Sequence, residues 1–405
     1  MIFRFNFVFI LLFVFAFRAT QAETPQQTFP TVDELPEVEE LPNPFVFLDG
    51  TTVKTPEDWE RRREEMIAIV LHYQFGHAPP LPAPDRINAE TISEATALNG
   101  QAVKRVVRLR FGPDNALSLL LEIYSPKNRH GPFPVIVHNS PGISEVDDEI
   151  VTDLVRRGYM LVSYQRTDLH PDWGKDPDAK KRRDRGDARR AYPDHDWGCL
   201  RVWAWGGSAT INWLSTLPEV DMKKIVCTGH SRGGQTAALM GMLDERVAIV
   251  APNAGGSITT GCHRFGNKSR RIKDKMNSSN AYWFHPNLIP FGDKETRLPF
   301  DLHFIKASVA PRAWFNANGL TDKLNVEGSM VSWRAAREVY DWLGVKERCA
   351  QWYRDGGHDQ GLQDWKALAD FADFIFFKTP LPDPKTFYQE PWPDIPLHYS
   401  WKAPH

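Results

Sequence analysis

Cysteine is scarce in this chain of 405 residues. The four cysteines are widely spaced and include no Cys-x-x-Cys pair, which excludes a disulfide-stabilised scaffold and does not fit a zinc site. An excess of one charge is also missing, since 49 Lys and Arg residues balance 51 Asp and Glu residues. A chain without a basic excess is not expected to bind nucleic acid. A glycine-rich phosphate loop, metal-ligand spacing and a redox motif are absent as well, so no metal or cofactor is predicted.

Long apolar runs are missing after residue 17. Before it, one positive charge at Arg4 precedes an almost unbroken run of Phe, Leu, Ile and Val, and small residues follow up to Ala22. This pattern predicts a secretory signal peptide over residues 1–22, because the run is too short to span a bilayer comfortably. An uncleaved N-terminal anchor is the alternative. We therefore expect a secreted or periplasmic protein without a membrane segment after cleavage, in which export permits one or two disulfide bridges.

The rest of the chain alternates between strand and helix patterns. Residues 23–50 are rich in Pro and Glu and predict an extended lead-in without packed structure, and residues 379–405 form a Pro-rich tail. Thr55 is the predicted N-cap of a helix that stops at Gly76. Between these ends we predict one domain, residues 51–378, with strands at 102–111, 117–124, 133–139, 159–164, 224–229, 246–251, 313–318 and 351–354 and helices at 148–157, 198–217 and 364–377. This order predicts an α/β fold with a mostly parallel twisted sheet and helices on both faces, whose active site lies at the carboxyl ends of the strands.

A Gly-x-Ser-x-Gly sequence from Gly229 to Gly233 joins one of these strands to a helix of small residues. A strand, a sharp turn and a helix form the nucleophile elbow of α/β-hydrolases, in which the serine backbone is strained and its hydroxyl is exposed above the sheet. We therefore predict Ser231 as a nucleophile. The other interpretation is a glycine-rich turn whose serine only caps the helix.

A serine nucleophile needs a base, and the base needs an acid that orients it. The expected order along this fold is serine, acid, histidine. His358 lies on a Gly-Gly-His loop after the strand at 351–354 and is the predicted base. Asp322 follows the strand at 313–318 and is the predicted acid, with Glu327 as an alternative. A turn or capping role is the other interpretation of Asp322.

Three charged features flank these residues. Arg232, beside the nucleophile, either stabilises an oxyanion or forms a surface salt bridge. The mixed-charge residues 175–190 predict a solvated insertion. Residues 264–275 carry six Lys and Arg residues just past a strand end. They form either an ordinary solvated loop or a lining of the site that favours an anionic substrate such as an acidic glycan.

Several further segments are distinctive: Thr-Pro-Glu-Asp-Trp at 55–59, Leu-Pro-Phe-Asp-Leu-His at 298–303, Ala-Pro-Arg at 310–312 and Asp-Trp-Lys-Ala-Leu-Ala-Asp-Phe at 364–371. Together with the elbow they resemble the glucuronoyl esterases of carbohydrate esterase family 15 over most of the mature chain. That family consists of secreted α/β-hydrolases that cleave esters of 4-O-methyl-glucuronic acid, including links between lignin and xylan. The resemblance implies Ser231 as nucleophile, Arg232 as an oxyanion contributor and His358 as base.

The chain departs from the family pattern at three positions. The motif Gly-Cys-Ser-Arg-x-Gly-Lys ends here in Gln235, where the family has a lysine that binds the uronate. The usual family acid falls on Ala254, and the tryptophan that touches the sugar falls on Leu324. Because Asp322 lies at the alternative strand end, a catalytic triad is retained. The lost lysine and tryptophan each remove about one to a few kcal/mol of recognition.

We therefore expect a serine-type carbohydrate esterase that acts on a polysaccharide or a uronic-acid-containing glycan. An acetyl esterase acting on xylan or another polysaccharide is the leading alternative, and a peptidase of the same fold is a weaker one. A glycan-binding protein that has lost catalysis is the alternative from another class, and Gln235 and Ala254 motivate it.

Overall fold

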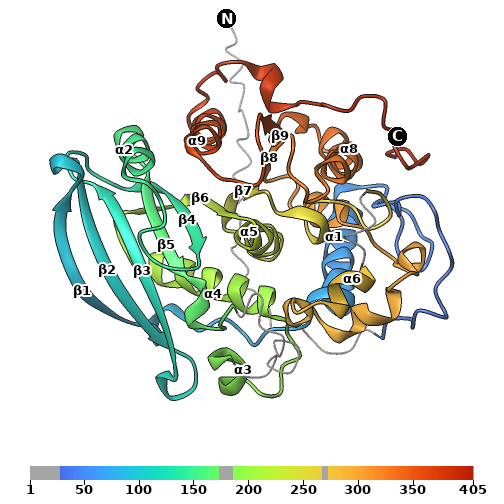
Figure 1. Cartoon of the computed structure of the whole chain (residues 1–405), viewed down its shortest axis with the longest axis horizontal. Coiled ribbons are helices and arrows are strands. Elements are labelled where there is room, and N and C mark those ends of the chain that lie inside the picture. Colours follow the sequence, from blue (N-terminus) through green and yellow to red (C-terminus); the bar gives the residue numbers. More distant parts are fainter. Residues whose placement is uncertain (1–27, 173–185, 267–271, 405) are drawn as a thin grey trace, which may run out of the picture.

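The computed structural model describes residues 28–172, 186–266 and 272–404 (Figure 1). The predicted signal peptide and most of the 175–190 stretch lie outside the described residues. A nine-stranded sheet organises the described part, with the strand order β1-β2-β3-β5-β4-β6-β7-β8-β9. This mostly parallel sheet, covered by helices, confirms the predicted α/β-hydrolase fold.

The first three strands form an antiparallel meander, and β3 pairs antiparallel with β5. From β5 to β9 all neighbouring strands are parallel. The strand bounds are β1 Asn88–Ala97, β2 Ala102–Phe111, β3 Leu117–Pro126, β4 Phe133–Ser140, β5 Met160–Gln165, β6 Val220–His230, β7 Val247–Asn253, β8 Ala313–Gly319 and β9 Cys349–Arg354. The helix bounds are α1 Pro56–Val70, α2 Asp148–Arg157, α3 Asp187–Ala191, α4 Cys199–Leu214, α5 Arg232–Leu243, α6 Ile272–Asn277, α7 His303–Ala307, α8 Val326–Trp342 and α9 Leu362–Phe377.

Side chains that alternate along the central strands enter two separate cores. In β4, Val135 and Val137 belong to the large core that also contains α4 and α5. Ile136, between them, belongs to the smaller core formed with α2 and α9. In the view of Figure 1, α2 and α9 lie above the sheet and α4 lies below it. The sheet is therefore apolar on both faces, as expected for parallel strands that helices cover on both sides.

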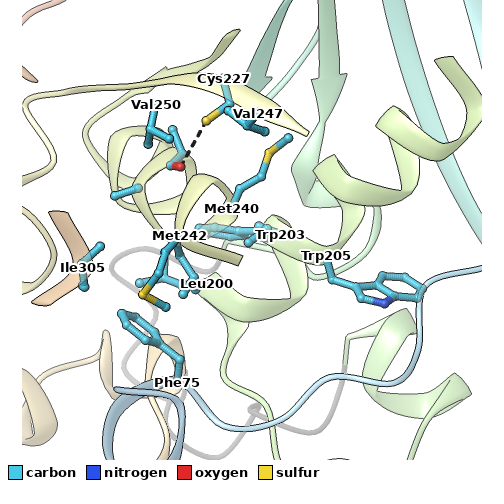
Figure 2. Close-up of a cluster of buried hydrophobic side chains, with 14 of the residues drawn as sticks. Phe75, Leu200, Trp203, Trp205, Cys227, Met240, Met242, Val247, Val250 and Ile305 are labelled. Atoms are coloured by element: carbon cyan, nitrogen blue, oxygen red, sulfur yellow. Dashed lines mark hydrogen bonds between the residues drawn. The ribbon is translucent and has the colours of Figure 1, made fainter. Parts of the chain in front are cut away.

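The large core fixes α5, the helix that follows the elbow. Figure 2 shows Met240 and Met242 of α5 among aromatic and aliphatic side chains of α4 and the neighbouring strands. Cys227 of β6 donates its thiol hydrogen to the carbonyl of Ala237 at 3.3 Å, which ties the elbow strand to α5. Burial raises the pKa of this thiol to about 12. All four cysteines are buried and free, so none of them forms a disulfide.

The helix predicted after Thr55 is present. The Thr55 side chain accepts the N–H of Asp58, and the Asp58 carboxylate accepts the N–H of Thr55 in return, which is a capping box. After Val70 the chain continues as a π-helical turn to Phe75, and Gly76 ends it with a φ of 76°. The predicted stop at this glycine is therefore confirmed.

The structure corrects one expectation about the lead-in, residues 23–50. Its described residues, 28–50, contain no helix or strand, but Leu41 and Phe45 are buried, so the prediction that it has no packed structure was wrong. The N–H of Leu41 donates to the carbonyl of His398 at 2.8 Å, which joins the lead-in to the C-terminal tail. A few anchoring apolar residues suffice to hold a segment whose average composition is polar. In the described ranges, no helix is long and apolar enough to cross a membrane.

Candidate active site

The backbone of Ser231 is strained in the way an elbow requires. Its φ is 56° and its ψ is −117°, outside the regions that side chains usually allow. Ser231 stands between the last residue of β6 and the first residue of α5. His230, Ser231 and Arg232 are partly exposed, whereas the residues on both sides of them in β6 and α5 are buried. The serine is thus presented at the carboxyl edge of the sheet.

The flanking glycines are required by close approach of the backbone. A Cβ at Gly229 would lie 2.5 Å from Asn139 Nδ2, and a Cβ at Gly233 would lie 2.8 Å from Asn139 Oδ1. The Asn139 amide donates to the carbonyls of Thr228 and Gly233, at 2.9 and 2.8 Å. Asn139 therefore clamps the end of β6 to the first turn of α5, and larger residues at the glycines would break this clamp.

The structure brings the predicted acid and base together. Nδ1 of His358 lies 2.8 Å from Oδ2 of Asp322, and the other oxygen of Asp322 accepts the N–H of Leu324 at 3.0 Å. The Asp322 side chain is 1% exposed, and that of His358 is 37% exposed. Because an ionised carboxylate only accepts hydrogen bonds, Nδ1 of His358 carries the proton and Nε2 keeps its lone pair. An imidazole held in this tautomer can act as a base at Nε2.

Glu327, the alternative acid, is exposed in the first turn of α8, and no hydrogen bond joins its side chain to His358 in the described residues. The three predicted residues follow strands that are close neighbours in the sheet: Ser231 follows β6, Asp322 follows β8 and His358 follows β9. The carboxyl ends of these parallel strands share one edge, which places residues 36 to 127 positions apart on the same side of the sheet.

An arginine beneath the histidine loop holds it in place, and the sequence analysis did not identify it. Arg354, the last residue of β9, donates to the carbonyl of Gly357 at 3.2 Å and to that of Asp359 at 2.7 Å. Its Nε donates to Oδ2 of Asp364 at 2.8 Å. Burial raises the pKa of Asp364, and its hydrogen bonds and the Arg354 charge counteract this shift. One signal of this pairing is visible in the sequence: an Arg and an Asp lie on the two sides of the His358 loop.

Arg232 forms the ion pair that was one of its two predicted roles. Its Nη1 lies 2.5 Å from Oδ2 of Asp172, and Tyr282 donates its hydroxyl to Oδ1 of the same carboxylate at 2.7 Å. The Arg232 guanidinium also lies 5.6 Å from the centre of the Trp283 ring. This position next to the serine is compatible with an oxyanion role, because a guanidinium has donors left after one ion pair. Asp172 and Trp283 are further site residues that sequence reasoning missed.

The three positions that depart from the family pattern have distinct surroundings. Gln235 is 5% exposed, and its Oε1 has no hydrogen-bond partner in the part of the chain that the structure describes. Ala254 is buried with a φ of 46°, and its N–H donates to the carbonyl of Ala317. Leu324 faces Gly256, where a Cβ would lie 3.1 Å from Leu324 Cδ1.

Residues 264–275 are only partly described. The Arg264 side chain is buried, pairs with Asp301 and donates to three backbone carbonyls of residues 296–300, so it has a structural role. Lys275 lies 5.4 Å from the centre of the Trp283 ring, which also contacts Arg232. Residues 267–271 lie outside the described ranges. Among the described residues, Lys275 thus contacts Trp283, an aromatic residue of the candidate site, whereas Arg264 pairs with Asp301 and has no contact with the site.

A nine-stranded α/β sheet with a strained serine at its elbow and an Asp-His pair at the neighbouring strand ends defines an α/β-hydrolase of the serine esterase type. Residues 112–344 match the family model described as glucuronyl esterase, fungi. This match covers more than half of the chain, and the chain therefore belongs to the glucuronoyl esterase family. The family resemblance stated from the sequence is confirmed, and with it the class of carboxylic-ester hydrolase.

Individual relatives agree with this assignment. The chain is 26% identical over 390 residues to carbohydrate esterase MZ0003 from an unknown prokaryotic organism, covering 82% of this chain and 89% of that protein. It is 28% identical to a 4-O-methyl-glucuronoyl methylesterase of Schizophyllum commune, covering 78% and 77%. Among solved structures, a carbohydrate esterase family 15 glucuronoyl esterase from Caldicellulosiruptor kristjansonii has a TM-score of 0.73 at 27% identity, covering 91% and 98%.

Proposed function

We propose that this protein is a secreted enzyme that hydrolyses esters of 4-O-methyl-glucuronic acid on polysaccharides, with Ser231 as nucleophile, His358 as base and Asp322 as orienting acid. The observation that carries the proposal is the 2.8 Å contact between His358 Nδ1 and Asp322 Oδ2, which follow β9 and β8 on the same edge of the sheet as the strained Ser231 after β6. The names of the relatives support the substrate class, and the apolar run at residues 5–17 supports export.

The chemistry proceeds in two half-reactions. Nε2 of His358 takes the proton of the Ser231 hydroxyl while Oγ attacks the ester carbonyl. The imidazolium then gives its proton to the departing alcohol, which leaves a glucuronoyl ester on Ser231. Water enters, loses its proton to Nε2 and releases glucuronate, and the proton returns to Ser231. Asp322 stabilises the imidazolium in both steps and is not itself protonated.

Arg232 supplies donors for the oxyanion in this proposal. The N–H of Ser231 already donates to the carbonyl of Asn253 at 3.0 Å, so it is not available to the substrate. The N–H of Arg232, in the first turn of α5, comes directly after the nucleophile, as in other α/β-hydrolases. The guanidinium of Arg232, held by Asp172, adds a positive charge near the same point.

The test compares wild type, Ser231→Ala and Asp322→Ala on methyl 4-O-methyl-glucuronate and on acetylated xylan. We expect turnover of the glucuronate ester by wild type and its loss in both variants. Turnover of acetate alone would overturn the proposed substrate and favour the acetyl esterase. Glycan binding without turnover of either ester would favour the binding protein. Glucuronate turnover that persists in Ser231→Ala would overturn the catalytic assignment.

A further inference from the structure

The side chain that precedes the nucleophile contacts the ring of the proposed base. The imidazoles of His230 and His358 have centroids 4.5 Å apart and an interplanar angle of 45°. Because His230 is the last residue of β6 and His358 lies on the loop after β9, this contact connects the elbow to the histidine loop across the edge of the sheet. The proposed mechanism assigns no role to His230.

A chain of hydrogen bonds fixes the His230 ring. Its Nδ1 lies 2.8 Å from Oδ1 of Asn253, and Nδ2 of Asn253 donates to Oδ1 of Asp364 at 2.9 Å. The Asp364 carboxylate only accepts, so it determines which way the Asn253 amide points. The amide oxygen therefore faces His230, and Nδ1 of His230 carries the proton. Arg354 holds Asp364 from the other side.

The two imidazoles differ in the charge of their partners. His358 donates to a carboxylate, whereas His230 donates to an uncharged amide. Burial lowers the pKa of His230, and the neighbouring His358 lowers it further. The other ionisable groups that act on His230 are Asp359 and Asp364, which oppose this shift, and the buried His138. The hydrogen bond to Asn253 also opposes the shift, but burial is the largest cause and disfavours a charged His230.

Arg354 holds the backbone of the His358 loop, but within the described residues the His358 imidazole has one hydrogen bond, to Asp322. The His358 side chain is 37% exposed, two glycines precede it, and Gly356 has a φ of 104°. One hydrogen bond to Asp322 fixes one ring atom but leaves the ring free to turn about the line that joins Nδ1 to Oδ2. A neighbouring ring that is itself fixed by a hydrogen bond restricts this rotation.

We infer that His230 is a positioning residue for His358: its hydrogen-bonded ring packs against the base and, together with Asp322, restricts its orientation. This inference rests on the proposed role of His358. It predicts that packing at position 230 affects kcat more than KM, because His230 acts through the orientation of a reacting group.

The test measures kcat, KM and Tm for His230→Ala and His230→Phe with the ester that wild type hydrolyses. His398→Ala is the matched control, because the His398 ring packs on Phe265 with a similar geometry, 4.4 Å and 43°, in the C-terminal segment. We expect His230→Ala to lower kcat about ten- to a hundredfold with a KM change below about threefold. His230→Phe restores the ring contact and recovers most of kcat, although it leaves Asn253 Oδ1 without a donor and lowers Tm. His398→Ala keeps wild-type kcat.

Two results would overturn the inference while leaving the proposed function intact, provided that Ser231→Ala is inactive. One is a wild-type kcat in His230→Ala. The other is a kcat in His230→Phe as low as in His230→Ala, which would make the residue only structural. If Ser231→Ala retains wild-type turnover, the proposed function fails and the inference fails with it.

Discussion

The carboxylate of Asp322 uses both oxygens, one for Nδ1 of His358 at 2.8 Å and one for the N–H of Leu324 at 3.0 Å. The second hydrogen bond fixes the carboxylate, which comes from the turn directly after β8. The acid is therefore in place before substrate arrives, and the strand end, not the substrate, determines its geometry.

Asp322→Asn tests this pair. The amide cannot stabilise an imidazolium, and its N–H₂ group favours the wrong tautomer of His358. We expect kcat to fall by about three to four orders of magnitude with a small change in KM. Steady-state kinetics measure this loss, and Glu327→Gln is the control that keeps wild-type activity. Equal losses in the two variants would contradict the assignment of the acid.

Asp172→Asn tests how Arg232, which we propose as an oxyanion contributor, is held. The variant keeps a partner for the Tyr282 hydroxyl but removes the charge that orients the Arg232 guanidinium. We expect kcat to fall about tenfold, because a displaced donor stabilises the transition state less. Arg232→Ala should lower kcat further than Asp172→Asn does, since it removes the charge altogether. An Asp172→Asn enzyme slower than Arg232→Ala would show that Asp172 acts on the reaction in another way.

Leu324→Trp introduces the ring that the family resemblance implies for this position. Leu324 is partly exposed beside Gly256, so a larger side chain extends toward solvent without filling the core. An aromatic surface against a sugar contributes about 0.5–1.5 kcal/mol, so we expect KM for the glucuronate ester to fall about two- to tenfold. The KM for a small aryl acetate, which has no sugar, is the internal control. A lower KM for both substrates would indicate a general change in the site.

Lys306 predicts a pH dependence of stability. It is fully buried, and its ammonium donates to the Thr260 carbonyl at 2.5 Å and to the Ser332 hydroxyl. Burial lowers its pKa from 10.5 to about 7. Between these two pH values the unfolded chain binds more protons than the folded chain, so the free energy of unfolding rises with pH across this window.

Lys306→Met removes this dependence. The Ser332 hydroxyl still donates to Thr260 at 3.1 Å in its absence, so no carbonyl is left unpaired. We expect the variant to gain most stability near pH 7 and least near pH 10, as measured by urea unfolding. Lys366→Met, at an exposed position of α9, is the control and keeps the wild-type slope. A gain in the free energy of unfolding that does not change with pH would contradict the lowered pKa of Lys306.

The elements that the sequence predicted best are those with strong local signals. The hairpin strands predicted at 102–111 and 117–124, the cap at Thr55 and the elbow at Ser231 all depend on short patterns of apolar, capping or glycine residues. The edge strand β1 was not predicted, because its residues are almost all exposed and show no alternation of apolar and polar side chains. The burial of Leu41 likewise depends on the distant tail.

The same difference between short local patterns and contacts of distant residues applies to the candidate site. Ser231, Asp322 and His358 could be predicted because each follows a strand in an order that the fold requires. The residues that hold them act through other hydrogen bonds: Arg354, at the end of β9, holds the His358 loop, and Asn253, at the end of β7, donates to Asp364 in the first turn of α9. Such contacts depend on sheet order and register, which no local pattern of a single sequence encodes.

The most direct test of the proposed mechanism is to identify the residue that a fluorophosphonate labels, by mass spectrometry of the digested protein. Such reagents react with a serine that a neighbouring base activates. We predict one adduct, on Ser231, in wild type and no adduct in His358→Ala. A wild-type enzyme that hydrolyses esters but carries no adduct on Ser231, or carries it on another residue, would contradict the account.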